Sequence, residues 1–141
     1  MEQQTFGGEH HTGRPTWIAM KRGFLGLCPH CGEGKLFSSF LKTVDRCAHC
    51  GEDMHHHRAD DLPAYLVVAI VGHIVVGAFM AVEATSTLST WQHLAIWAPL
   101  TVIASLLLLQ PIKGAVVGLQ WANYMHGFGD GDDVMETHPE I

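Results

Sequence analysis

Two long uncharged segments dominate the pattern of hydrophobic and polar positions along the chain. No Asp, Glu, Lys or Arg occurs in the 21 residues 62–82 or in the 20 residues 91–110. A helix needs roughly 20 apolar residues to cross the ~30 Å hydrocarbon core of a bilayer, and both segments reach that length. The remaining residues could hardly cover two such helices in a soluble domain. The pattern therefore predicts an antiparallel hairpin of two transmembrane helices, over about 62–82 and 91–110.

Basic residues are distributed unevenly around these two segments. Seven of the eight Lys and Arg residues precede the first segment, one follows the second, and the connecting residues 83–93 contain none. Because Lys and Arg concentrate in cytoplasmic flanks, the pattern predicts that both termini lie in the cytoplasm and that the connection faces outward. The formal net charge of −6 leaves no basic face of the kind that nucleic acids bind, so no nucleic-acid partner is expected.

Two shorter segments show an amphipathic pattern with aromatic residues on one side. Residues 113–128 read "KGAVVGLQWANYMHGF", and residues 17–24 read "WIAMKRGF". The residues that share one helical face are Val117, Trp121, Tyr124 and Phe128 in the first segment, and Trp17, Met20 and Phe24 in the second. Helices of this type lie in the membrane interface, which is the prediction for both segments. Packing against the cysteine-containing part of the chain is the alternative.

The four cysteines form two pairs with the spacing of a metal site. Cys28 with Cys31, and Cys47 with Cys50, each read C-x-x-C-G, and fifteen residues separate the pairs. Each pair can bend around one ion, two pairs complete a tetrahedron, and the following glycine permits the positive φ of such a turn. The spacing predicts a structural zinc site with one Zn²⁺. Redox-active dithiols, or another metal such as an iron–sulfur cluster, are the alternatives, while a cytoplasmic location disfavours disulfides.

Eleven of the fifteen residues between the pairs, "LFSSFLKTVDR" (36–46), predict short strands around a turn. Their apolar members would form a small core of Leu36, Phe37, Phe40, Leu41 and Val44. A module of ~25 residues buries too little apolar surface to fold alone, so metal binding is expected to drive its folding.

Histidines surround this module. His30 and His49 each precede the last cysteine of a pair and are expected to be neighbours of the metal rather than ligands, because four thiolates already complete the site. The run His55, His56 and His57 precedes the first hydrophobic segment. It is expected to be an interfacial linker, with weak binding of a second metal as the alternative.

Several of these stretches occur together in one known family. "CPHCGEGKLF", "RCAHCGED", "ADDLPAYLVVAIVGHIVVG", "WQHLAIWAPL" and "LLLLQPIKGAVVGLQW" follow in that order, and together they resemble the bacterial membrane-protein family called domain of unknown function 983. The resemblance covers roughly residues 22–125. It implies a zinc ribbon followed by two transmembrane helices in the bacterial inner membrane. Family genes are often found near those for cytochrome oxidase assembly, and this resemblance implies a respiratory role. The family has no established activity, so the resemblance implies none.

Polar residues at the membrane segments are the other candidate site. Asp60 and Asp61 precede the first segment and are expected to cap its helix, with a functional acid as the alternative. His73 lies near the middle of that segment, where an unpaired ring is costly, so it is expected to face protein. In an antiparallel hairpin, Thr101 and Ser105 lie near its depth and could hydrogen-bond with it. A hydrogen bond that sets the hairpin register and a contact with a partner, metal or haem are both open.

Three classes of function fit these features. The first is a non-catalytic adaptor or accessory factor that binds another membrane protein, such as a respiratory-oxidase complex. The second is a metal or haem handling protein that uses the membrane and juxtamembrane histidines, and the third is a thiol oxidoreductase. No Ser/His/Asp set, phosphate loop or H-E-x-x-H motif is present in the sequence, so no enzyme activity is expected.

The expected fold is a small cytoplasmic four-cysteine zinc ribbon of short β-hairpins, followed by an antiparallel transmembrane hairpin and an interfacial amphipathic helix. The expected divisions are a flexible or interfacial N-terminal segment (1–22), the zinc ribbon (23–58), the transmembrane hairpin (59–112), the amphipathic stretch (113–128) and an acidic tail (129–141).

Overall fold

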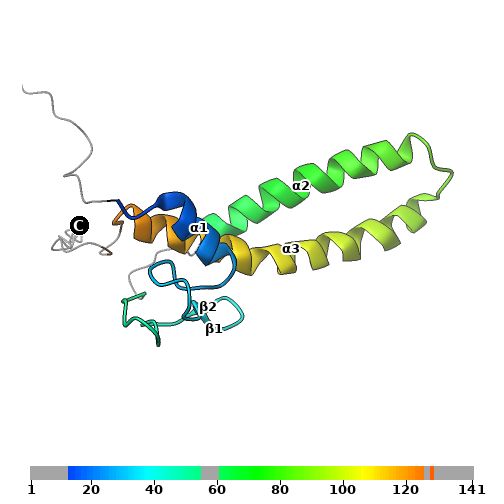
Figure 1. Cartoon of the computed structure of the whole chain (residues 1–141). Coiled ribbons are helices and arrows are strands. Elements are labelled where there is room, and N and C mark those ends of the chain that lie inside the picture. Colours follow the sequence, from blue (N-terminus) through cyan, green and yellow to red (C-terminus); the bar gives the residue numbers. More distant parts are fainter. Residues whose placement is uncertain (1–12, 55–60, 126–127, 129–141) are drawn as a thin grey trace, which may run out of the picture.

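The computed structural model describes residues 13–54, 61–125 and 128. Two long helices form an antiparallel hairpin, and a small cysteine-containing unit lies beside the end of the hairpin where the chain enters and leaves it (Figure 1). The N-terminal segment 1–12, the histidine run 55–57 and the acidic tail 129–141 lie outside the described residues.

Helix α2 spans Leu62–Glu83 and helix α3 spans Thr90–Ala122. Pro63 lies in the first turn of α2, where its missing N–H removes no helical hydrogen bond. Helix α3 begins with a capping box, since Ser89 Oγ accepts from Gln92 N and the Gln92 side chain accepts from Ser89 N. The two predicted hydrophobic segments are therefore helical along their whole length.

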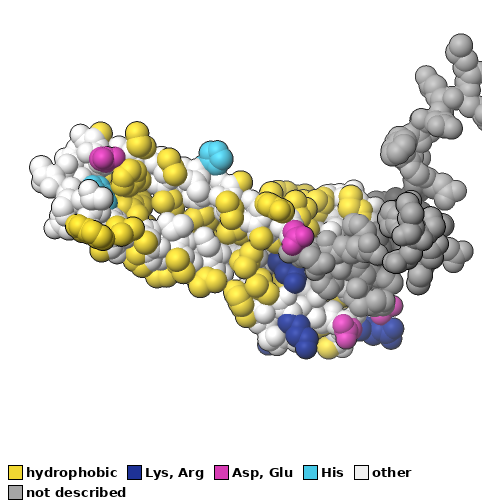
Figure 2. Space-filling model, turned by 180° about the vertical axis from the view of Figure 1, so that it is seen from behind, with side chains coloured by type: hydrophobic (Ala, Val, Ile, Leu, Met, Phe, Trp, Pro, Cys, Tyr) yellow, Lys and Arg dark blue, Asp and Glu magenta, His cyan; other side chains and the backbone are white. Residues whose placement is uncertain are grey.

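Both helices leave their apolar surface uncovered by the rest of the chain. Only 11% of the most apolar window of α2 and 22% of that of α3 are buried. Apolar side chains cover the hairpin, while charged side chains gather mainly near the cysteine-containing end (Figure 2). A core helix of a soluble protein would be mostly buried, so this exposure supports two membrane spans.

The chain differs from expectation after residue 110. Helix α3 continues through Pro111 to Ala122, so residues 113–122 are its last turns rather than a separate helix. Val117, Trp121 and Phe128, which were expected to anchor in the membrane interface, are instead buried in protein, and Tyr124 is half-buried. The alternative, packing against the cysteine-containing part of the chain, is what the structure shows for this face. The physical reason is that the N-terminal helix α1 (Thr16–Phe24) and the ribbon cover it.

Helix α1 spans Thr16–Phe24 and crosses the last turns of α3 at very short range. A Cβ atom on Gly23 would overlap the backbone of Gly114, and one on Gly114 would overlap that of Gly23. One turn along α3, Gly118 lies against the backbone of Ala19 in the same way. The stretch Gly114–Gly118 is a G-x-x-x-G pattern, which allows helix backbones to approach closely. The outer face of α1 stays exposed, with Trp17 at 75%.

The ribbon contains one short hairpin. Strand β1 (Phe37–Ser39) pairs antiparallel with β2 (Lys42–Thr43), with Phe37 opposite Thr43. The isolated bridges Leu27–Lys35 and Arg46–Asp53 close the two cysteine turns.

The ribbon does not have a core of its own. Leu36 is fully buried, but Phe40 is 58% exposed, in contrast to its expected place in the ribbon core. The buried cluster instead joins α1, the ribbon and the end of α3, and contains Ala19, Cys28, Leu36, Cys47, Met54, Val116, Val117, Trp121, Ala122 and Phe128. The ribbon and the end of the hairpin beside it thus fold around one shared core, which the sequence did not predict.

Candidate metal centre and membrane histidines

The four cysteines converge as predicted. Their Sγ atoms all lie within 4.8 Å of one another, and all four are free thiols. The close contacts join one cysteine from each pair, with Cys28 Sγ 3.7 Å from Cys50 Sγ and Cys31 Sγ 3.8 Å from Cys47 Sγ.

These distances fit a tetrahedral metal site. Zn–S bonds of ~2.3 Å at tetrahedral angles place two sulfurs about 3.8 Å apart, close to both measured contacts. Four thiolates without an open position are typical of structural zinc. Cys28, Cys31, Cys47 and Cys50 would hold the ion and draw the two halves of the ribbon together.

Each cysteine pair lies on a turn closed by the backbone. Gly32 N donates to Cys28 O at 2.8 Å, and Gly51 N donates to Cys47 O at 3.0 Å. Gly32 and Gly51 have φ angles of 71° and 77°, the left-handed region that glycine adopts without strain. The positive φ predicted for the residue after each pair is confirmed.

The thiols differ in their affinity for a proton. Burial raises the pKa of Cys28 far above its ordinary range, and it raises the pKa of Cys50. Burial also acts to raise the pKa of Cys31, but backbone N–H groups of Gly34 and Glu33 donate to its Sγ and, with the neighbouring thiols, lower the pKa to about 6. Cys31 is therefore the ligand whose metal-binding thiolate form the protein itself stabilises.

His30 and His49 are neighbours of the cysteine cluster rather than members of it. The ring of His30 meets the ring of Trp121 edge-on, with centroids 5.6 Å apart. His49 Nε2 lies 2.6 Å from Glu33 Oε2, which links the second cysteine turn to the first. Each contact joins a residue of a cysteine turn to another part of the structure.

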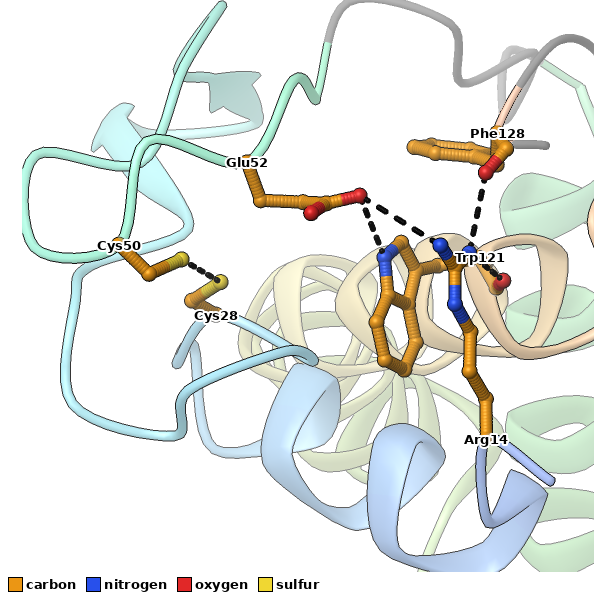
Figure 3. A network of polar contacts seen from close by, with 6 residues as sticks. All are labelled: Arg14, Cys28, Cys50, Glu52, Trp121 and Phe128. Carbon is orange, nitrogen blue, oxygen red and sulfur yellow. Dashed lines mark hydrogen bonds and ion pairs between the residues drawn. The ribbon is translucent and has the colours of Figure 1, made fainter. Parts of the chain in front are cut away.

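A polar network that the sequence analysis missed joins the ribbon to α3 (Figure 3). Trp121 Nε1 donates to Glu52 Oε1 at 3.0 Å, and Glu52 follows Cys50 by two residues. Arg14 Nη1 donates to the carbonyls of Trp121 and Phe128, and its other Nη lies 3.8 Å from Glu52 Oε1. The Arg14 guanidinium also stacks 4.2 Å from the centre of the Trp121 ring. A lone Arg or Glu in sequence gives no signal of such long-range pairing.

His73 does not make the expected contact with the second helix. Its ring is exposed on α2, and Nδ1 donates to Ala69 O of the same helix at 2.6 Å. Val67 and Val71 are the buried residues in the middle of α2, and His73 lies two residues, or about 200°, beyond Val71. It therefore projects from the opposite side. Thr101 Oγ1 donates to Trp97 O of its own helix, and among the described residues no hydrogen bond joins Ser105 to α2.

The histidine between the two helices is instead His93, near the connecting loop. It is 8% exposed, with Ser86 Oγ 3.4 Å from Nε2 and Trp97 Nε1 donating to Nδ1 at 3.3 Å. The ring of Phe79, on α2, meets it edge-on. The sequence could have indicated the contact of His93 with Trp97, because side chains at positions i and i+4 meet on a helix.

Of the two acidic residues before α2, only Asp61 is among the described residues, and it does not cap the helix. Asp61 occupies the N-cap position, but its carboxylate makes no capping hydrogen bond. Asp60, the other expected cap, lies outside the described residues, as do the juxtamembrane histidines.

A comparison with known protein families gives a match. The family model described as "Protein of unknown function (DUF983)" matches residues 37–121, more than half of the chain. The match includes the second cysteine pair and both long helices, and it begins after the first pair. No curated protein and no solved structure matches the chain.

Proposed function

We propose that this chain, which belongs to the DUF983 family, is an integral inner-membrane adaptor whose zinc ribbon and helical hairpin bind another membrane protein. The proposed role is non-catalytic, with one structural Zn²⁺ held by the four cysteines. A respiratory-oxidase complex, the association expected from the family resemblance, is the first partner to seek.

The observation that carries this proposal is the outward-facing imidazole of His73. In a helix of 22 residues it lies about 16 Å from either end, and so near the middle of a bilayer. Nδ1 is satisfied by Ala69 O, which leaves Nε2 as an acceptor without a partner among the residues described. A polar atom facing hydrocarbon is costly, and ionisable residues at this depth usually mark a functional contact.

The surface around His73 suits a second helix. Ala69 and Gly77 lie one turn to either side on the same face, and a Cβ on Gly77 would meet nothing within 4 Å. Small residues allow helix backbones to approach closely, so a partner helix could bring a donor such as a hydroxyl or indole N–H to Nε2.

Co-purification in mild detergent tests the proposal. The His73→Leu variant should insert, hold zinc and lose the partner, whereas His73→Gln, which keeps an acceptor, should retain part of the binding. Ile103→Ala, an apolar truncation at a similar depth on α3, is the control and should bind normally. Unchanged partner recovery with His73→Leu would contradict the proposal, and a visible haem band or bound copper lost with His73 would support metal or haem handling instead.

A further inference from the structure

A cavity of about 370 Å³ lies where α1, the ribbon hairpin and α3 meet. Its lining is mostly apolar and includes Phe24, Leu25, Phe40, Leu106, Leu107 and Gln110. Several of these side chains are exposed, among them Leu25 at 63%, Phe40 at 58% and Leu107 at 72%. Exposed apolar residues of α1 and the ribbon are thus continuous with the surface of a membrane-spanning helix.

The shared lining sets the depth of the cavity. Leu106 and Leu107 belong to the last turns of the uncharged segment that ends at Gln110, and they are exposed where the helix faces lipid. Side chains that share a cavity with them must lie at the same level of the bilayer. Phe24 and Phe40 therefore lie at the boundary between hydrocarbon and headgroups, where aromatic residues are favourable.

A cation lies one turn beyond the cavity. Lys113 follows Gln110 by three residues on α3, and its Nζ donates to Leu41 O at 2.6 Å. Leu41 has a φ of 60°, a left-handed conformation that is strained for this residue and turns the hairpin beside Phe40. Among the described residues no carboxylate pairs with Lys113 within 4.0 Å. Its ammonium has two further N–H donors for an anion.

We propose that this cavity binds one acyl chain of an anionic phospholipid and that Lys113 binds its phosphate. Phe40 and the outer face of α1 then insert into the same leaflet, so that the ribbon lies in contact with the membrane surface. The occupant is a phospholipid because the apolar lining comes before Lys113 along α3, in the order in which a lipid presents its chain and its phosphate, and none of the described carboxylates pairs with that lysine.

Photo-crosslinking in nanodiscs tests the site. A benzophenone amino acid replacing Phe40 should form covalent adducts with phospholipid, detected by mass spectrometry, whereas the same group replacing the exposed Ala48 in the second cysteine turn should form none. Competition between phosphatidylglycerol and phosphatidylcholine measures the headgroup preference. A basic residue near an anionic surface changes binding about fivefold, so Lys113→Gln should lower the preference for phosphatidylglycerol about fivefold and Lys113→Arg should keep it.

The outcomes separate a lipid site from a folding defect. The metal content of each variant reports whether the ribbon is intact, and Leu107→Gln, which leaves the Lys113–Leu41 contact in place, should reduce adduct formation at position 40. Protein adducts alone at position 40, or equal use of the two lipids by the unchanged protein, would overturn the proposal.

Discussion

Gly34 constrains the metal centre although it binds no metal. A Cβ atom at this position would overlap Cys47 Sγ. Gly34 N also donates to Cys31 Sγ, and Gly34 O accepts from Cys28 N at 2.7 Å. One residue without a side chain therefore contacts three of the four ligands.

We expect Gly34→Ala to weaken zinc binding about 10- to 100-fold, the range typical of changes in groups that orient metal ligands. The added methyl group must displace Cys47 Sγ from its place beside the other three sulfurs. Competition with a chromogenic chelator measures the affinity. Lys35→Ala, next to it and exposed, is the control; equal affinities for the two variants would show that Cys47 has room to move.

Loss of one ligand should have a larger effect that stays local. Cys28→Ser removes a thiolate that is fully buried in the core shared with Trp121, so the variant should lose its zinc and loosen the ribbon. The hairpin should remain inserted, because its insertion depends on α2 and α3. Metal content and resistance to alkaline extraction check the two halves of this prediction, and a full complement of zinc in the variant would place the metal elsewhere.

The positions and backbone conformations of some residues could be predicted because a short local sequence pattern determines them. Two C-x-x-C-G turns specify their own geometry, so the cysteines and the positive φ of Gly32 and Gly51 followed from sequence. The direction of His73 did not, since it depends on which face of α2 meets α3. Two buried valines decide that, and the surrounding run is apolar on every side.

At the scale of elements, the crossing of α1 over α3 depends on glycine. The backbones of Gly23 and Gly114 lie too close for a Cβ on either one. This contact is part of the shared core, so it positions the ribbon relative to the hairpin.

We expect Gly114→Ala to destabilise the packing of α1 by ~1–3 kcal/mol, the usual cost of forcing an extra methyl group into a packed contact. Hydrogen exchange of the α1 amides should become faster. Gly77→Ala, which meets nothing within 4 Å, should leave the exchange unchanged. Unchanged exchange in the Gly114 variant would mean that α1 is not held by this crossing.

Helix existence was easier to predict than helix extent. Uncharged runs of membrane length identified α2 and the start of α3, but the polar and aromatic residues after Pro111 suggested a new element. The pattern Gly114–Gly118 indicated instead that another helix packs there. The meaning of this glycine pattern becomes clear only when the helix that packs against it, α1, is known.

At the scale of the whole molecule, the orientation in the membrane is open to a direct test. A cysteine replacing Thr87, which is exposed in the loop between α2 and α3, should react with an impermeant thiol reagent added outside intact cells. A cysteine replacing the exposed Ser38 of the ribbon should not react. The reverse pattern would invert the predicted topology.

Helix α3 is continuous, so it connects the membrane segment directly to the ribbon. Its 33 residues extend about 50 Å, and roughly the last third lies beyond the uncharged segment, clasped by α1 and by Glu52 through Trp121. A rotation of α3 as one body would move Trp121, and the hydrogen bond from Trp121 to Glu52 would pass that movement to the ribbon. A protein that binds the hairpin inside the bilayer would therefore also change the orientation of the cysteine-containing ribbon outside it.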